Sequence, residues 1–208
     1  MLVEQGIAPV DLSDARLRTH ELSELFLRHE MMIVDIHVKL SLTSKTGDVR
    51  LVSWTEGSQL FDEVIAMDAK GSSRLPIRPD AFFSLKDSLR PEGANRTHFV
   101  LEADRSTANH TRFQEKIRGY WSYVEQGRPE KKFGVKGFRV LTVTLTDARA
   151  KNLTALAASL VPERARKYFL FISLSKLNSA SNPIREAVCY SPRGAVDQLH
   201  SLVALPSN

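Results

Sequence analysis

The order of hydrophobic patterns along the chain constrains its fold more than any other feature. Helical spacing of apolar residues begins at Thr19 and ends before Lys45, and three short strand-like segments follow it. Strand and helix patterns then alternate, up to a continuous apolar run of strand length. After the first helix, strands are expected over 49–55, 81–85, 98–104, 138–146 and 168–174, and helices over 111–125 and 147–160.

This order predicts how the strands pair. Three strands joined by turns predict an antiparallel meander. A strand, a helix and a second strand in succession predict a right-handed crossover with parallel pairing. We therefore expect an α/β fold with a mixed sheet, an antiparallel meander plus parallel strands, flanked by helices.

Four segments carry weaker patterns. Residues 1–18 contain Gly, Pro and Asp and are expected to form an irregular lead-in, with Thr19 as the N-cap of the helix that follows. Residues 59–74 show no decisive periodicity. The stretch 127–137 sets four basic residues among Gly and Pro and predicts a mobile basic loop, whereas residues 196–203 predict a short helix.

Size and charge narrow the classes of function. The 208 residues, 42% of them hydrophobic, suffice for one domain with its own core, expected over residues 19–208. Residues 111–208 hold 16 Lys and Arg against 7 Asp and Glu, whereas residues 1–110 hold 13 against 17. Basic charge gathered in one half favours a polyanion such as DNA as partner, although a solvated basic surface explains it equally well.

The sequence carries no sign of export or of membrane insertion. Its single cysteine, Cys189, excludes an intrachain disulfide and a cysteine-based zinc site. No basic region precedes an apolar stretch at the N-terminus, and no apolar run approaches the roughly 20 residues of a membrane span. The sequence therefore predicts a cytoplasmic protein without a membrane partner.

Three carboxylates are expected to meet at one edge of the sheet. Side chains two apart on a strand share a face, so Glu102 and Asp104 lie together at the end of their strand, opposite its apolar face. Asp80 begins the neighbouring strand, and in an antiparallel pair the start of one strand lies beside the end of the next. Oxygen ligands grouped in this way suit a hard divalent cation. The apolar face consists of Phe99, Leu101 and Ala103.

Lys116 flanks the buried face of the helix 111–125. A lysine there can lay its stem along apolar surface and bring its ammonium to the strand end, where it would stabilise charge on a phosphate. The alternative is structural: Glu102 and Asp104 would then be strand-end carboxylates paired with Arg105 and Arg112. Similarly, His29 lies on the apolar stripe of the first helix, which is typical of a hydrogen-bonded core histidine.

Three short motifs follow one another in the middle of the chain. They are Arg-Pro-Asp-Ala-Phe-Phe (78–83), His-Phe-Val-Leu-Glu-Ala-Asp-Arg-Ser-Thr (98–107) and Gln-Glu-Lys-Ile-Arg-Gly-Tyr (114–120). The helix Leu-Arg-His-Glu (27–30) precedes them and the strand Leu-Thr-Val-Thr (141–144) follows them. The combination resembles the restriction-endonuclease-like PD-(D/E)XK nuclease core and, more narrowly, the replication-relaxation family of plasmid and mobile-element proteins, over roughly residues 19–175.

The resemblance implies roles for individual residues. Asp80 and Glu102 match the carboxylates that hold Mg²⁺ or Mn²⁺ in the nuclease core, and Asp104 would support them. Lys116 would stabilise the charge of the reacting phosphate, and Glu30 on the first helix is a candidate further metal ligand. Where the broad superfamily places its catalytic lysine, however, this chain has Asp104.

The resemblance leaves three functions open. The first is a DNA-binding protein of plasmid or mobile-element replication or transfer that hydrolyses phosphodiester bonds with Mg²⁺. The second is a catalytically inactive DNA-binding protein with the same fold, and the third is an adaptor for replication or transfer proteins. The candidate phosphate contacts are Arg112, Lys131, Lys132, Lys136 and Arg139.

Members of the replication-relaxation family usually carry an N-terminal winged helix that binds DNA. The eighteen residues before the first expected helix are too few for that module. Two interpretations follow. Residues 1–18 are the remnant of a missing winged helix, or the nuclease-like core and its basic half bind DNA without one.

Overall fold

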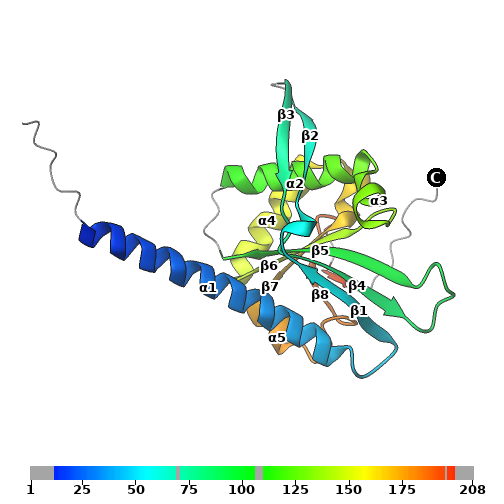
Figure 1. Ribbon diagram of the computed structural model, residues 1–208. Helices are drawn as coiled ribbons and strands as arrows, with labels where there is room; N and C mark the ends of the chain where they lie inside the picture. The colour runs from blue at the N-terminus through cyan, green and yellow to red at the C-terminus, as the bar shows by residue number, and fades with distance from the viewer. Residues whose placement is uncertain (1–11, 69–70, 106–109, 195, 200–208) are drawn as a thin grey trace, which may run out of the picture.

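The computed structural model describes residues 12–68, 71–105, 110–194 and 196–199, which form a mixed sheet with helices on both faces (Figure 1). The strands, in order across the sheet, are β1 (Val49–Glu56), β4 (Ala81–Asp87), β5 (Arg96–Asp104), β6 (Arg139–Thr144), β7 (Phe169–Ser173), β8 (Ala187–Tyr190) and β9 (Val196–Gln198). The helices are α1 (Leu12–Thr43), α2 (His110–Glu125), α3 (Arg128–Phe133), α4 (Asp147–Leu160) and α5 (Leu174–Ser179), with short 3₁₀ turns at Ser58–Leu60 and Glu163–Tyr168.

The pairing of the strands confirms the predicted α/β fold with a mixed sheet. β1, β4 and β5 pair antiparallel, which is the expected meander. β5, β6 and β7 pair parallel, and α2, α3 and α4 lie in the connections between them. None of the described helices is long and apolar enough to cross a membrane.

The two faces of the main sheet carry separate hydrophobic cores. α1 and α5 pack on one face, against Phe99 and Leu101 of β5. α2 and α4 pack on the other face, against Val100. Consecutive residues of β5 thus face opposite layers, and this alternation directs Glu102 and Asp104 toward α2 and α4.

Residues left without a predicted structure form a β-hairpin. β2 (Asp62–Asp68) and β3 (Gly71–Ile77) pair antiparallel as a separate two-stranded sheet that projects beyond the main one (Figure 1). Val64 and Ile77 are buried against α2, whereas Ile65 and Met67 are exposed on the opposite face. Serine and glycine interrupt the apolar alternation in β3, so the sequence alone does not identify this strand.

The first helix is longer than predicted. Residues 12–18 belong to α1, so the prediction of an irregular lead-in is wrong for them, and residues 1–11 lie outside the described part of the chain. Thr19 is accordingly an interior helical residue rather than an N-cap. Residues 12–18 hold neither Gly nor Pro, so nothing in that segment stops a helix.

Two further predictions need correction. The supposed basic loop contains the helix α3, bounded by Gly127 and Gly134 in the left-handed conformation (φ 64° and 67°), with Pro129 in its first turn. Residues 196–198, expected to be helical, form β9, because pairing with β8 prevails over a weak local helical pattern; residues 200–203 lie outside the described residues. In α4 the N-cap is Thr146 and not Asp147, which the sequence predicts as the cap, so the helix begins one position earlier than expected.

Candidate functional site

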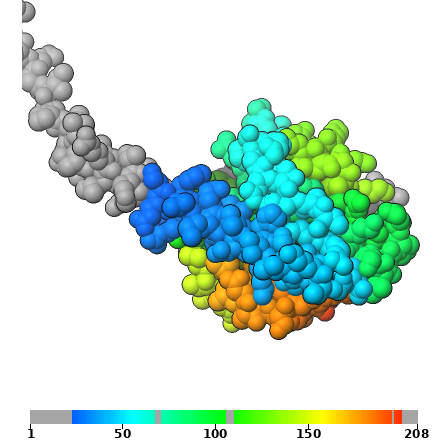
Figure 2. All heavy atoms as spheres, turned by 60° about the horizontal axis from the view of Figure 1, so that its bottom comes forward, coloured from blue at the N-terminus to red at the C-terminus, as the bar shows by residue number. Residues whose placement is uncertain are grey.

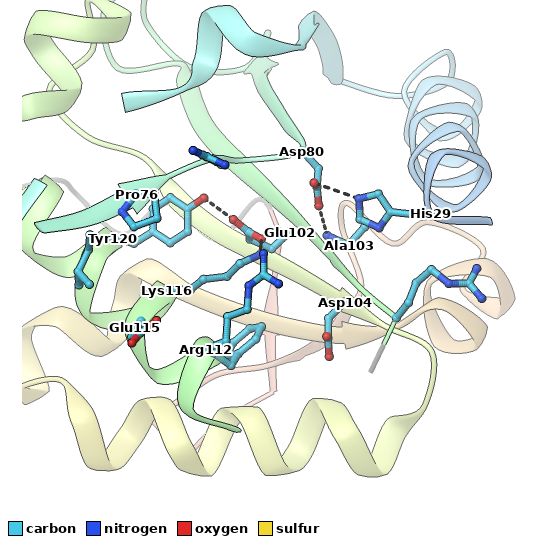
Figure 3. Close-up of a pocket in the computed structure, with 14 residues that line it drawn as sticks. His29, Pro76, Asp80, Glu102, Ala103, Asp104, Arg112, Glu115, Lys116 and Tyr120 are labelled. Atoms are coloured by element: carbon cyan, nitrogen blue, oxygen red, sulfur yellow. Dashed lines mark hydrogen bonds and ion pairs between the residues drawn. The ribbon is translucent and has the colours of Figure 1, made fainter. Parts of the chain in front are cut away.

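A pocket of about 310 Å³ opens where β5 ends and β4 begins, between α1 and α2 (Figure 3). Asp80 enters it from the start of β4, Glu102 and Asp104 from the end of β5, and Lys116 from α2. The four predicted catalytic residues therefore line the same pocket. The other lining residues are His29, Leu75, Pro76, Arg78, Ala103, Arg105, Arg112, Phe113, Glu115 and Tyr120.

Asp80 is held at the edge of β5 by its backbone and its side chain. Its N–H donates to the carbonyl of Leu101 at 3.0 Å, and its Oδ2 accepts the N–H of Ala103 at 2.7 Å. His29 Nε2 lies 3.1 Å from Asp80 Oδ1, and this hydrogen bond raises the pKa of His29. The His29 side chain is 29% exposed, so its predicted hydrogen bond is present but its predicted place in the core is wrong.

Glu102 is buried, and both of its carboxylate oxygens meet protein donors. The Tyr120 hydroxyl donates to Oε1 and the Lys116 ammonium to Oε2. Lys116 and Tyr120 are four residues apart on α2, so they share the face that is turned toward β5. Burial works against charge on Lys116, but the adjacent Glu102 raises its pKa, so the ammonium is charged at neutral pH. Burial and Glu102 together raise the pKa of Tyr120, so its hydroxyl stays a donor.

Asp104 is also buried, and it pairs with a cation from α4. Arg149 Nε in the first turn of α4 donates to Asp104 Oδ2 at 2.8 Å. Arg105, which the structural alternative pairs with these carboxylates, instead donates through Nη1 to the carbonyl of Arg28 at 2.8 Å. Arg105 thereby ties the end of β5 to α1.

Exposed cations stand at the mouth of the pocket above its buried carboxylates. Arg78 and Arg112 are both exposed, and the guanidinium of Arg78 lies 5.7 Å from the ring centre of Phe61. Glu115 is an exposed acidic residue on the same rim. Two arginines at the opening of a pocket suit a phosphate group better than they suit a neutral ligand.

The donor set can be tested against the Mg²⁺ or Mn²⁺ implied by the sequence resemblance. Carboxylates of Asp80 and Glu102 are hard oxygen ligands of the kind these cations prefer. In the described residues, however, no three His, Cys, Asp or Glu side chains are grouped so as to hold a metal ion. His29 and Lys116 occupy one oxygen of each carboxylate instead. The donors fit such a cation in chemistry, but they are not arranged for it while these two contacts persist.

The comparison with protein families decides where the chain belongs. The family model described as replication-relaxation matches residues 7–137. The chain belongs to the replication-relaxation family. The match spans all the pocket-lining residues, from His29 to Tyr120, whereas α4 and the strands after it lie beyond the match. No curated protein and no solved structure matches the chain. Membership of the replication-relaxation family suggests a role in the replication or transfer of plasmids or mobile elements.

The remaining candidate residues lie away from the pocket, apart from Arg112. Glu30 follows His29 on α1 but does not line the pocket. Lys131 and Lys132 are exposed on α3 and Lys136 just after it, at the far end of α2 from Arg112 (Figure 1). Sixteen residues of helix span about 24 Å, so these lysines and the pocket are separate features of the surface.

Arg139 is not on the surface. Its side chain is 4% exposed, and it pairs with Asp197 at 2.9 Å and donates to the carbonyls of Lys167 and Leu199. The prediction that Arg139 contacts phosphates is therefore corrected: its guanidinium joins β6 to the segment around β9 inside the fold. Four further residues of the site were not predicted from the sequence, namely His29, Arg78, Tyr120 and Arg149. Of these, only Tyr120 carries a local signal, its helical spacing from Lys116.

Proposed function

We propose that this replication-relaxation protein binds the DNA of a plasmid or mobile element and hydrolyses a phosphodiester bond in the pocket at the end of β5. The observation that carries the proposal is the convergence of Asp80, Glu102 and Lys116 from three separate elements. The order α1, β1, β4, β5, α2, β6 supports it, because it resembles the PD-(D/E)XK core to which the sequence motifs point.

The side chains of the pocket have distinct tasks in this proposal. Arg78 and Arg112 at the mouth draw in the phosphodiester and fix its position. The Lys116 ammonium turns from Glu102 toward the phosphate and stabilises the charge that develops on it. Tyr120 keeps Glu102 oriented while Lys116 moves. Once His29 releases Asp80 and Lys116 releases Glu102, these two carboxylates would hold a divalent cation, which would supply an activated water and charge stabilisation.

A second function is favoured by a specific observation. Asp104 stands where the superfamily places its catalytic lysine, and it pairs with Arg149 at 2.8 Å. A pocket that has lost this lysine can keep its exposed arginines and bind DNA without cleaving it. This second candidate is a DNA-binding protein of the same replication or transfer process with no hydrolytic activity.

One experiment separates the two functions. Supercoiled plasmid is incubated with the protein and Mg²⁺ or Mn²⁺, and nicked circles and DNA binding are both measured. The hydrolytic function predicts nicking that is lost in Asp80→Asn and in Lys116→Met while DNA binding is retained. Glu115→Gln, which changes an exposed rim residue, is the matched control and should still nick.

The other outcomes are equally informative. Salt-sensitive DNA binding with no nicking under either cation would reject hydrolysis and support the second candidate. Nicking that survives in Asp80→Asn would place the activity elsewhere. No DNA binding at low salt would reject both candidates and leave the adaptor hypothesis.

A further inference from the structure

α1 is apolar on two opposite faces. Met32, Ile33, Ile36 and Leu40 are buried against the main sheet. A second set of apolar residues, each exposed over roughly half of its surface, lies along the opposite side of the helix. This outer stripe consists of Leu27 (59% exposed), Met31 (57%), Val34 (56%), Val38 (49%) and Leu42 (56%).

The outer stripe has the geometry of a helix-pairing seam. Its members follow one another at intervals of four, three, four and four residues, which is close to the heptad spacing of a coiled coil. At 100° per residue the stripe points roughly opposite to the buried face, so nothing in the main sheet can cover it. Figure 2 views the molecule from the side of α1, where the helix runs across the surface. The stripe is about 22 Å long.

We propose that the outer stripe of α1 is the interface of a homodimer, in which α1 pairs antiparallel with α1 of a second copy. With the twofold axis between residues 32 and 33, Leu27 packs against Val38 of the second copy. Met31 then packs against Val34 of the second copy. Both contacts occur twice, as an isologous interface requires.

The charges beside the stripe favour a second copy in the antiparallel orientation. In that orientation Arg28 faces Asp35 of the second copy, and this opposite-charge contact also occurs twice. In a parallel pair, Glu30 would face Asp35 of the second copy, a like-charge contact repeated on both sides. Because Arg28 already pairs with Glu24 of its own helix, its contact with Asp35 sets orientation more than affinity.

The first test measures oligomeric state on the full chain without DNA or added metal, so its result does not depend on the proposed function. Light scattering and sedimentation should give the mass of two chains, with dissociation on dilution. Met31→Glu combined with Val34→Glu should give a monomer with unchanged circular dichroism. The control Met67→Glu, at an apolar residue 75% exposed on the hairpin, should remain dimeric. A monomeric wild type, or a dimer that survives the double substitution, would overturn the proposal.

The second test reads the orientation. Asp35→Arg should weaken the antiparallel dimer at least several-fold, and adding Arg28→Asp to it should restore most of the affinity. A parallel dimer would respond oppositely, since Asp35→Arg would replace a repulsion by an attraction to Glu30. Tighter association of Asp35→Arg would therefore refute the antiparallel arrangement.

Discussion

The carboxylate of Asp80 accepts the backbone N–H of Ala103 at 2.7 Å, so a side chain at the start of β4 completes the hydrogen bonding of β5. The same carboxylate meets His29 of α1 at 3.1 Å. Asp80 thus joins three elements at the edge of the pocket, besides the metal-binding task we propose for it. Variants of Asp80 must separate the two tasks.

Asp80→Ala and Asp80→Asn should therefore differ in stability. Alanine leaves the N–H of Ala103 without its acceptor and should cost about 1–3 kcal/mol of unfolding free energy. Asparagine keeps an oxygen for that N–H and should cost less than alanine does. Urea unfolding of both variants measures the difference, and equal losses would show that the hydrogen bond contributes little.

Lys116→Met should destabilise the protein by leaving the buried carboxylate of Glu102 without its cation. We expect a loss on the order of 2 kcal/mol, below that of a fully buried pair, because the Lys116 side chain is 34% exposed. Adding Glu102→Gln should recover part of the loss, since no buried charge is then left unpaired. For comparison, Arg74→Ala removes the exposed Arg74–Glu63 pair and should change stability by less than about 0.5 kcal/mol.

Arg112→Ala should weaken DNA binding and reduce its dependence on salt. One lost phosphate contact lowers the slope of log affinity against log salt by about 1. Lys131→Ala tests the α3 surface in the same titration, because Lys131 lies at the other end of α2. If Lys131→Ala changes the slope and Arg112→Ala does not, DNA binds over α3 rather than at the pocket.

The pair of Asp147 and Tyr190 should make stability depend on pH in acid. The Tyr190 hydroxyl donates to Asp147 Oδ2 at 2.6 Å, and this bond lowers the pKa of Asp147. Because the pKa of Asp147 is lower in the folded state, ionised Asp147 stabilises the fold at pH values above the ordinary pKa of an aspartate. That stabilisation is lost as the pH falls through the pKa of Asp147 in the folded protein. Tyr190→Phe should thus cost at most about 0.5 kcal/mol near neutral pH, because the Asp147 side chain is 41% exposed and solvent screens its contacts, and it should cost less as pH falls below the ordinary pKa of an aspartate. Urea unfolding across this range measures it; a loss independent of pH would mean that packing, not the ionised carboxylate, is responsible.

Local periodicity determined the order of the main elements and the faces of β5. Alternation along residues 98–104 turns Glu102 and Asp104 away from the apolar side, and antiparallel pairing brings Asp80 to the same edge. Lys116 reaches that edge because helical spacing aligns it with the buried face of α2. These results follow from the two-residue period of a strand, the 3.6-residue period of a helix and the antiparallel pairing of two neighbouring strands. All three can be read from the sequence.

Only the tertiary structure decided which partners these side chains meet. Arg149 and Asp104, which form a hydrogen bond, are 45 residues apart in the sequence. His29 and Asp80 are 51 residues apart, and the buried Arg139 and its partner Asp197 are 58 residues apart. No local pattern encodes such pairs, because they depend on how α1, α4 and β9 pack around the sheet. The hairpin β2–β3 and the strand β9 were missed for the same reason: packing on α2 and pairing with β8 stabilise segments whose own propensities are weak.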